Sequence, residues 1–384
     1  MTILDLKRQF SQFLSSDPAR LHFAAHSHAC WPDASRDGQL LAWADAARLI
    51  DGKWEHVLGH VYPAAQAHVA RQLSLPDPDS VVFAPNTHEL VKRILSCFPV
   101  GRPIRLLTSD SEFHSFARQV ARMEEDGLVQ AVRIPTVPFD SFATRFAEAA
   151  KAGTYDLIFV SQVFFNSGFA VEDFSGIAAA AGEAMLVVDG YHAFMAKPVD
   201  WSKLASRAFY IAGGYKYAMA GEGAAFMHCP PGWGERPRDT GWYAAFGALS
   251  AAQDSRTAYT DTGWRFMGST FDPSGLYRFN AVQDWLQREG ITVADIHAHV
   301  RALQDRFTAA LPAGPLKAAQ LVVPKDQPRG NFLTFELENA ATVQMQLAKA
   351  KVVTDYRGTR LRIGFGLYHT AEDVDALLRR IQAL

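Results

Sequence analysis

The sequence predicts an α/β fold in which a large domain, with a mostly parallel sheet and helices on both faces, precedes a smaller α+β domain. Between about residues 78 and 230, short apolar runs rich in β-branched and aromatic residues alternate with longer helical stretches. From about Pro273 onward, long helices come first and strands follow. The 384 residues also exceed the size at which one hydrophobic core stops growing. Two domains are therefore expected in one chain.

Seven short apolar runs are the expected strands of the large domain. They cover residues 80–84, 104–110, 131–137, 155–163, 184–190, 206–213 and 223–229. Segments between them, such as residues 87–98 and 173–183, have the apolar spacing of helices. Because ligands of open α/β sheets bind beyond the carboxyl ends of the strands, we expect functional groups to gather there.

The C-terminal part reads as helices followed by strands. Helices are expected at 275–290 and 296–314, and strands at 331–337, 350–356 and 360–366. A final helix begins near Thr370, whose hydroxyl can cap it. The expected divisions are an N-terminal segment at the edge of the active site that packs with the small domain, a large domain, and a small domain: residues 1–50, 51–270 and 271–384.

Composition and charge exclude several classes of protein. Hydrophobic residues make up 48% and charged residues 20%, which is ordinary for globular chains and argues against long disordered tails. The net charge is −2 and the 38 basic residues are scattered, so nucleic-acid binding is not expected. The start lacks the pattern of a signal peptide, and no apolar run is long enough to span a bilayer. The three cysteines show no CxxC spacing and fit a reducing compartment, so we expect a soluble cytoplasmic protein without a metal.

Lys216 is the first candidate catalytic residue. It lies in a loop just after an expected strand, with Gly213 and Gly214 before it. Glycines let the backbone approach a bound group closely, and the neighbouring Tyr215 and Tyr217 could wall a pocket. A lysine enclosed in this way can have a lowered pKa and act as a nucleophile toward carbonyls. A surface loop lysine is the alternative, and this residue alone would not decide between the two.

Asp189 ends another apolar run, where a parallel strand would deliver a carboxylate to the active edge of the sheet. A pyridinium nitrogen is a suitable cationic partner, because a fixed carboxylate keeps it protonated and makes the ring a stronger electron sink. His192, three residues later, could lie over such a ring or hydrogen-bond the carboxylate. The alternative for Asp189 is a simple helix N-cap.

Other strand ends carry further candidates. Thr87 begins an expected helix, whose free N–H groups and dipole attract phosphate, although Asn86 or Thr87 could equally be a simple cap. Phe113 and His114 could stack on a planar ring, and a core phenylalanine is the alternative. Ser167 could donate a hydrogen bond to a ring hydroxyl or to the substrate, or it could form a turn.

Arginines near the C-terminus suggest an anion-binding residue. Arg360 and Arg362 lie two positions apart in an expected strand, so they share a face. One of them could clamp a substrate carboxylate in bidentate fashion. Surface arginines on a half-exposed strand are the alternative.

Together these motifs resemble the class V aminotransferase group of fold-type I enzymes that depend on pyridoxal 5′-phosphate (PLP), and among them most of all kynureninase. The most specific parts are GYKYAMAGEG around Lys216, similar to the kynureninase SYKY...GPG stretch, and DGYHA from Asp189, similar to its D.YHA segment. The resemblance covers most of the chain. It implies the PLP-dependent transferase fold type I and an enzyme that holds its cofactor as a Schiff base.

The resemblance also assigns roles around the cofactor. Lys216 would form the internal aldimine, and Tyr215 would hydrogen-bond the phosphate. Asp189 would pair with the pyridinium, with His192 close to that aspartate. Thr87 would match the phosphate-binding position, with His88 as its neighbour, and Trp242 would match a tryptophan that approaches the phosphate. Phe113 would match a ring-stacking aromatic, and Ser167 a hydroxyl residue near the cofactor.

On the substrate side, the resemblance assigns Arg362 to the α-carboxylate. Ser269, or Thr270 instead, would reach the cofactor of the neighbouring subunit, which implies a homodimer with shared active sites. The segment LHFAAHSHACWPD departs from the family pattern at a place near the substrate. This segment adds three candidate substrate-binding residues: His26, Ser27 and His28.

The implied reaction is kynureninase-like hydrolysis of an amino acid. The substrate would displace Lys216 from the cofactor. The freed lysine would then remove the α-proton, and the PLP ring would accept the electrons of the broken bond. Water would attack the side-chain carbonyl, and cleavage of the Cβ–Cγ bond would release alanine and an aromatic acid, with Tyr215 helping to shuttle protons. An aminotransferase or another PLP β-lyase uses the same lysine and is the main alternative. A cysteine desulfurase fits less well, because no cysteine follows Cys229.

Two alternatives do not involve PLP. An NAD-binding dehydrogenase would need a GxGxxG motif after a first strand, and this motif is missing. A zinc hydrolase could use His22, His26 and His28, whose spacing could place them on one face of a strand. No acidic partner or later ligand motif accompanies these histidines.

Overall fold

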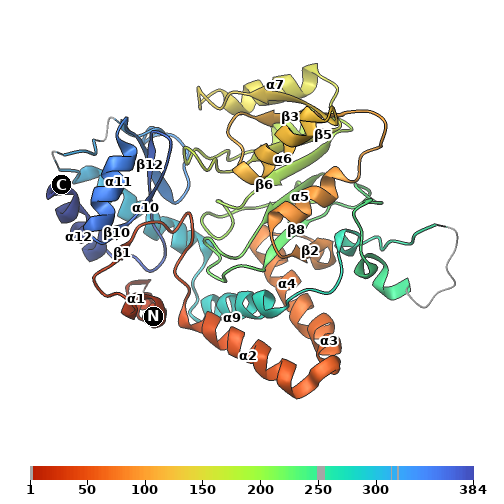
Figure 1. The fold of residues 1–384 in the computed structure, drawn as a ribbon, viewed down its shortest axis with the longest axis horizontal. Coiled ribbons are helices and arrows are strands. Elements are labelled where there is room, and N and C mark those ends of the chain that lie inside the picture. The colour runs from red at the N-terminus through yellow and green to blue at the C-terminus, as the bar shows by residue number, and fades with distance from the viewer. Residues whose placement is uncertain (1–2, 249–255, 313, 318–319) are drawn as a thin grey trace.

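The computed structural model describes residues 3–248, 256–312, 314–317 and 320–384. Its large domain is built on a seven-stranded sheet with the strand order β2-β8-β7-β6-β5-β3-β4 (Figure 1). The strands are β2 (Val81–Ala84), β3 (Ile104–Ser109), β4 (Val129–Ile134), β5 (Leu157–Ser161), β6 (Met185–Asp189), β7 (Ala208–Ala212) and β8 (Ala225–His228). β8 runs antiparallel to both of its neighbours, whereas the other adjacent pairs are parallel. The mostly parallel sheet predicted from the sequence is confirmed.

Helices cover this sheet and enclose its central strands. β5 and β7 are buried along their whole length, as expected when helices pack on both faces of parallel strands. α5 shows why these helices pack, because Leu90, Val91 and Ile94 recur at helical spacing and are buried. The helices between the strands are α5 (Thr87–Leu95), α6 (His114–Glu125), α7 (Phe142–Ala152) and α8 (Ser175–Ala180).

The small domain, blue in Figure 1, combines an antiparallel sheet with three helices. Its sheet has the order β11-β12-β9. The predicted strand 350–356 is divided in two, because its first part leaves this sheet and pairs with β1 from the N-terminal segment. The predicted cap of the last helix is present, since Thr370 and Asp373 form a capping box. The elements are α10 (Val293–Ala309), β9 (Phe332–Glu336), α11 (Ala340–Lys349), β10 (Val352–Val353), β11 (Asp355–Arg357), β12 (Arg360–Gly364) and α12 (Ala371–Gln382).

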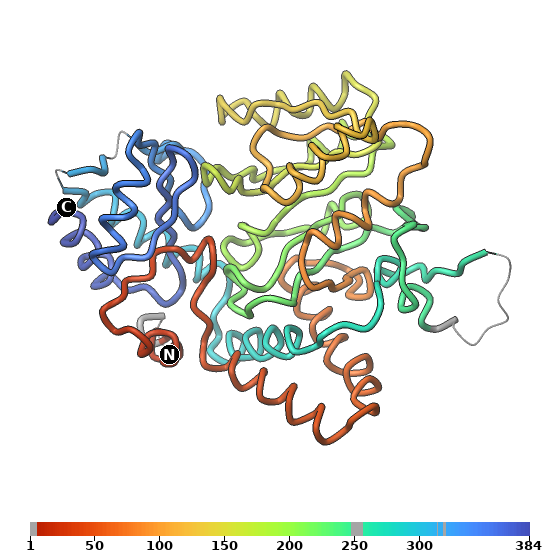
Figure 2. Tube along the Cα trace, viewed as in Figure 1, coloured from red at the N-terminus to blue at the C-terminus, as the bar shows by residue number. Residues whose placement is uncertain are grey.

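The N-terminal segment connects the two domains, and Figure 2 shows its red trace running from the small domain to a long helix. β1 (Leu21–His22) pairs in parallel with β10, and the Gly364 amide donates a hydrogen bond to the Phe23 carbonyl at 2.7 Å. The chain then continues into α2 (Asp33–Leu49), which packs along α9 (Ser274–Arg288). This path carries residues 24–31 past the carboxyl-end loops of the large sheet, where the Ala29 amide bonds the Tyr215 carbonyl at 3.2 Å.

The remaining helices complete the fold. They are η1 (Ile3–Phe10), α1 (Ser11–Ser15), η2 (Ile50–Gly52), α3 (Lys53–His56), η3 (Val57–Val61), α4 (Tyr62–Leu73), η4 (Pro78–Ser80), η5 (Trp242–Ala248) and η6 (Gly263–Phe266). Within the described residues, every helix is too short or too polar to cross a lipid bilayer.

Candidate active site

A small pocket lies where β3, β5, β6 and β7 end. This is the expected place, because ligands of open α/β sheets bind beyond the carboxyl ends of the strands. Its walls come from the loops after these strands and from the start of α5. The lining residues are Thr87, Phe113, Ser161, Val163, Phe165, Asp189, Tyr191, His192, Tyr215 and Lys216.

Lys216 is buried in this pocket, with only 5% of its surface exposed. Its Nζ lies 2.8 Å from His192 Nε2 and 4.5 Å from the centroid of the Tyr191 ring. Burial lowers the pKa of the lysine to about 7, and the nearby Arg362 charge lowers it further, whereas the Asp189 carboxylate opposes the shift. A large fraction of the amine is therefore neutral near pH 7, as a nucleophile or a general base requires.

Asp189 and His192 surround the lysine but do not bond each other. Asp189 is the last residue of β6, and its Oδ1 accepts a hydrogen bond from the Tyr191 amide at 2.9 Å. Burial raises the pKa of this carboxyl. His192, which the sequence placed beside Asp189, bonds Lys216 instead, because the turn after β6 directs Nε2 toward the amine. Burial, followed by the Lys216 charge, holds the pKa of His192 well below its usual value, so its ring is neutral.

The start of α5 forms one end of the pocket. Asn86 is the N-cap, and its side chain accepts a hydrogen bond from the Glu89 amide at 3.1 Å. Thr87 is therefore the first helical residue, and it lines the pocket. The free N–H groups of this first turn suit a phosphate. His88 is half-buried but is not among the lining residues.

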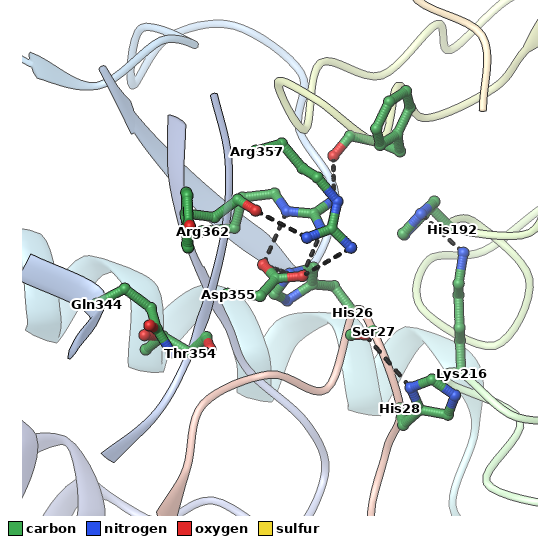
Figure 3. Close-up of polar contacts among 12 residues, drawn as sticks. His26, Ser27, His28, His192, Lys216, Gln344, Thr354, Asp355, Arg357 and Arg362 are labelled. Carbon is green, nitrogen blue, oxygen red and sulfur yellow. Dashed lines mark hydrogen bonds and ion pairs between the residues drawn. The ribbon is translucent and has the colours of Figure 1, made fainter. Parts of the chain in front are cut away.

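The predicted carboxylate-binding residue, Arg362, is buried at 4% exposure and already has a carboxylate partner. Its Nε donates to Asp355 Oδ1 at 2.9 Å, its Nη2 donates to Asp355 Oδ2, and its Nη1 donates to the Phe165 carbonyl at 2.6 Å (Figure 3). Burial favours neutral Asp355, but hydrogen bonds and charges from His26 and Arg362 outweigh this and lower the pKa of that carboxyl. Sequence reasoning missed Asp355, although its position opposite Arg362 in the DYRGTRLR hairpin was a usable signal.

The N-terminal histidines occupy different environments. His26 is fully buried, stacks on Phe332 with ring centroids 4.8 Å apart, and has its Nε2 2.8 Å from Asp355 Oδ1. Burial lowers the pKa of His26 to about 4 despite the carboxylate, so the neutral ring donates this bond. His28 is exposed and stacks on Tyr215 at 4.8 Å, and its Nδ1 lies 3.3 Å from the Ser27 hydroxyl.

Several predicted residues lie outside this pocket. Ser167 Oγ accepts a hydrogen bond from the Phe169 amide at 3.2 Å, so the turn alternative describes it, and Ser161 lines the pocket instead. Trp242 is 44% exposed and stacks on Tyr243 with centroids 4.0 Å apart. Two further residues, assigned by resemblance to a neighbouring subunit's cofactor, are exposed just before α9: Ser269 and Thr270.

The three histidines of the zinc alternative are directed to separate partners. His22 Nδ1 lies 2.7 Å from the Tyr368 hydroxyl, whereas His26 bonds Asp355 and His28 stacks on Tyr215. Across the described part of the chain, no three His, Cys, Asp or Glu side chains come together as a metal-binding group. The structure thus offers this alternative no support.

Glu112 forms a buried network beneath the pocket that sequence reasoning missed. Its Oε1 accepts a hydrogen bond from the Ser109 hydroxyl at 2.5 Å and its Oε2 accepts one from the Ser161 hydroxyl at 2.5 Å. The Ser161 amide also donates to Oε1 at 3.2 Å. Burial raises the pKa of Glu112 to about 7, and the Asp189 charge adds to the increase. The network ties pocket-lining Ser161 to the residue just before Phe113.

Glu112→Gln is expected to change how stability depends on pH. An unfolded glutamate has a pKa of about 4.3, so between about pH 4.3 and 7 the folded protein holds a proton that the unfolded chain has released. Wild-type stability therefore falls as pH rises through this window, by about 4 kcal/mol in total. Glutamine mimics the protonated acid and should lose this fall. The unfolding temperature should decrease less between pH 5 and pH 8 in E112Q than in wild type. The control is Glu148→Gln, which changes an exposed glutamate and should behave as wild type. Equal decreases in all three proteins would contradict the assignment.

The residues that line the pocket suit PLP. PLP enzymes present a lysine to the cofactor aldehyde, a carboxylate to the pyridinium nitrogen and N–H donors to the phosphate. Here Lys216, Asp189 and the start of α5 border one pocket. His192 adds a buried polar atom, since its Nδ1 has no hydrogen-bond partner among the described residues.

Comparisons with known proteins agree with this fit. The family model of aminotransferase class-V matches residues 52–377. An isopenicillin N epimerase of Streptomyces clavuligerus is 26% identical over 338 residues, covering 80% of this chain and 81% of the relative. A probable cysteine desulfurase of Vibrio cholerae serotype O1 is 21% identical over 346 residues, covering 83% of this chain and 81% of the relative.

Solved structures show the same fold. The cystine C–S lyase C-DES, in complex with its reaction product cysteine persulfide, superposes with a TM-score of 0.82 at 16% identity, covering 96% of this chain and 98% of that chain. The cysteine desulfurase CsdA of Escherichia coli gives a TM-score of 0.79 at 18% identity, covering 100% of this chain and 98% of that chain. No particular likeness to kynureninase emerges from these matches. The chain belongs to the aminotransferase class-V family and is a PLP-dependent enzyme of fold type I.

Proposed function

We propose that this enzyme acts on an α-amino acid whose carboxylate is bound by Arg362 and whose Cα proton is removed by Lys216. The observation that carries this proposal is that Arg362 contacts a residue of the pocket that Lys216 lines. Lys216 lines it directly, and Arg362 Nη1 bonds the carbonyl of Phe165, another lining residue. An amino acid bound between them would present its Cα hydrogen to a lysine whose pKa is about 7.

Bound PLP supplies an electron sink for the bonds at Cα. The chain's own residues orient the reactants and move protons. Lys216 takes the Cα proton, and the neutral His192 ring, 2.8 Å away, can accept a hydrogen bond from that amine. Burial raises the pKa of Tyr215 to about 12, so its hydroxyl stays protonated and can donate a hydrogen bond. Asp189 keeps a carboxylate at the end of β6 for the pyridinium nitrogen.

Within this proposal, we assign the reaction as hydrolysis of the Cβ–Cγ bond, as in kynureninase, which would release alanine and an aromatic acid. Aromatic rings around the pocket support a planar substrate side chain. The rings of Phe113 and Phe165 are T-shaped with centroids 5.4 Å apart, and the His114 ring lies 4.8 Å from Phe165. His28 stacks on Tyr215 nearby. Such a wall favours an aryl group over a small polar one.

An aminotransferase or β-lyase would use the same lysine, but a desulfurase that loads sulfur on its own thiolate is disfavoured. Cys30, Cys97 and Cys229 are outside the lining of the pocket. Burial raises the pKa of these thiols to about 11, 12 and 12 respectively, so they stay protonated.

One experiment separates removal of the Cα proton, which all the candidate reactions share, from the later step that distinguishes them. Holoenzyme in D₂O with L-kynurenine, L-cystine or L-alanine should exchange the Cα hydrogen of at least one of them, measured by NMR. Release of alanine and anthranilate from kynurenine would support hydrolysis, pyruvate from cystine would support a β-lyase, and amino transfer to a 2-oxo acid would support an aminotransferase. Absence of both exchange and product with a broad amino-acid panel would overturn the proposal.

We also propose a homodimer in which Ser269 or Thr270 reaches the partner's cofactor. α2 exposes three large apolar side chains, with Leu40, Leu41 and Trp43 at 53%, 54% and 78% exposure. An exposed apolar surface of this kind favours association. Because α2 packs along α9, whose start follows Thr270, the two features lie on neighbouring elements. Light scattering should give twice the mass of the chain, and a monomer at assay concentration would refute this arrangement.

A further inference from the structure

The hairpin of β11 and β12 brings a carboxylate to the predicted substrate-binding arginine. The register pairs Asp355 directly with Arg362, and Gly358 supplies the positive φ of +57° at the turn. Directly opposed residues of antiparallel strands project from the same face of the sheet. Their meeting is therefore built into the hairpin and does not depend on a flexible surface contact.

The contact between Asp355 and Arg362 occupies one edge of the Arg362 guanidinium. An arginine has five N–H donors. Asp355 takes one from Nε and one from Nη2, and the Phe165 carbonyl takes one from Nη1. Among the described residues these contacts engage three donors and leave two. Since Phe165 lines the Lys216 pocket, the Nη1 hydrogen bond places the guanidinium next to a residue of the pocket wall.

His26 fixes the carboxylate from the other side. Its Nε2 donates to Asp355 Oδ1 at 2.8 Å (Figure 3). Its ring stacks on Phe332. Gly364 makes room for this ring, because a Cβ at that position would lie 2.1 Å from His26 Nδ1. Asp355 is thus held between a buried histidine and a buried arginine.

We propose that Asp355 is a positioning residue for substrate recognition: it holds the Nε and Nη2 edge of Arg362 so that the two remaining N–H groups bind the substrate carboxylate. This inference rests on the proposed function, in which Arg362 binds that carboxylate. A guanidinium clamped on one edge has lost its rotational freedom before the substrate arrives, so binding requires less ordering. Asp355 also supplies the counter-charge that a buried arginine needs in the free enzyme.

Asp355→Asn tests the proposal, because it preserves size but removes the second acceptor and the charge. Two probes are titrated into the holoenzyme while the cofactor absorbance is followed: L-alanine, which carries a carboxylate, and ethylamine, which lacks one. D355N should weaken L-alanine about 10- to 100-fold and leave ethylamine unchanged. The matched control is Glu336→Gln, which removes the carboxylate bonded to Arg360 Nε at 3.0 Å in the same sheet and should change neither.

Arg362→Lys separates this inference from the proposed function. If R362K leaves L-alanine binding intact, the carboxylate role of Arg362 fails, and the proposed function fails with it. If R362K weakens L-alanine but D355N does not, only the positioning role is overturned. Equal weakening of both probes by D355N, or the same loss in E336Q, would show a general structural effect and also overturn it. Should D355N not fold, His26→Leu, which removes the donor to Asp355, should give a smaller loss confined to L-alanine, and its absence would refute the inference.

Discussion

Lys216→Ala is expected to abolish covalent retention of PLP and to lower the rate of Cα hydrogen exchange by about 10²- to 10⁴-fold, the range for loss of a positioned general base. Lys216 is the buried amine of the pocket, and its pKa of about 7 makes it largely neutral under mild conditions. His192 cannot take over this role fully, because burial holds its pKa well below the usual value and leaves it a weak base. Methylamine added to K216A should restore part of the exchange, since the missing group is an amine.

Two measurements check the Lys216 assignment. Borohydride treatment of the wild-type holoenzyme followed by peptide mapping should place the cofactor label on Lys216. Covalent uptake of PLP by the wild-type apoprotein should accelerate as pH rises through about 7, because deprotonation frees the amine. Lys197→Ala is the matched control, since Lys197 is also buried but pairs with Glu172 at 3.1 Å outside the pocket lining. A label on another lysine, or full exchange activity in K216A, would contradict the assignment.

The elements that the sequence predicts well are those coded by local patterns. Central strands of the large sheet, such as β5 and β7, are short apolar runs because they are buried on both faces, and no distant contact is needed to recognise them. Lys216 and Asp189 stood out for the same reason, since each follows or ends such a run. The division of residues 350–356 was not predictable locally, because it depends on pairing between β10 and the distant β1.

Residues missed around the pocket owe their roles to contacts between distant segments. Ser161 was passed over for Ser167 because β5 ends at Ser161, earlier than its apolar run suggests, and strand ends are hard to place from sequence. Glu112 becomes a buried acid only when Ser109 and Ser161 from two strands converge on it. Asp355 gains its significance from the hairpin register and from His26, which lies 329 positions earlier.

Asp189→Asn should lower turnover by about 10²- to 10³-fold, the cost of removing one preorganised charge from an active site, while the fold is retained. Asparagine can keep the local structure, because its Oδ1 can still accept the Tyr191 amide at the present 2.9 Å. It cannot hold a proton on a pyridinium nitrogen, so the cofactor becomes a poorer electron sink. The loss should therefore appear in the rate of Cα hydrogen exchange and in weaker PLP affinity, with little change in apoprotein stability.

The matched control for Asp189→Asn is Asp200→Asn. Asp200 makes the same kind of turn, with its Oδ1 accepting the Ser202 amide at 3.0 Å, but it is exposed and is not among the residues that line the pocket. D200N should retain wild-type exchange and PLP affinity. If D189N and D200N behave alike, the Asp189 carboxylate only stabilises the turn in which it accepts the Tyr191 amide. If D189N loses exchange activity while its apoprotein unfolds at the wild-type temperature, the effect belongs to the charge that Asp189 presents to the pocket.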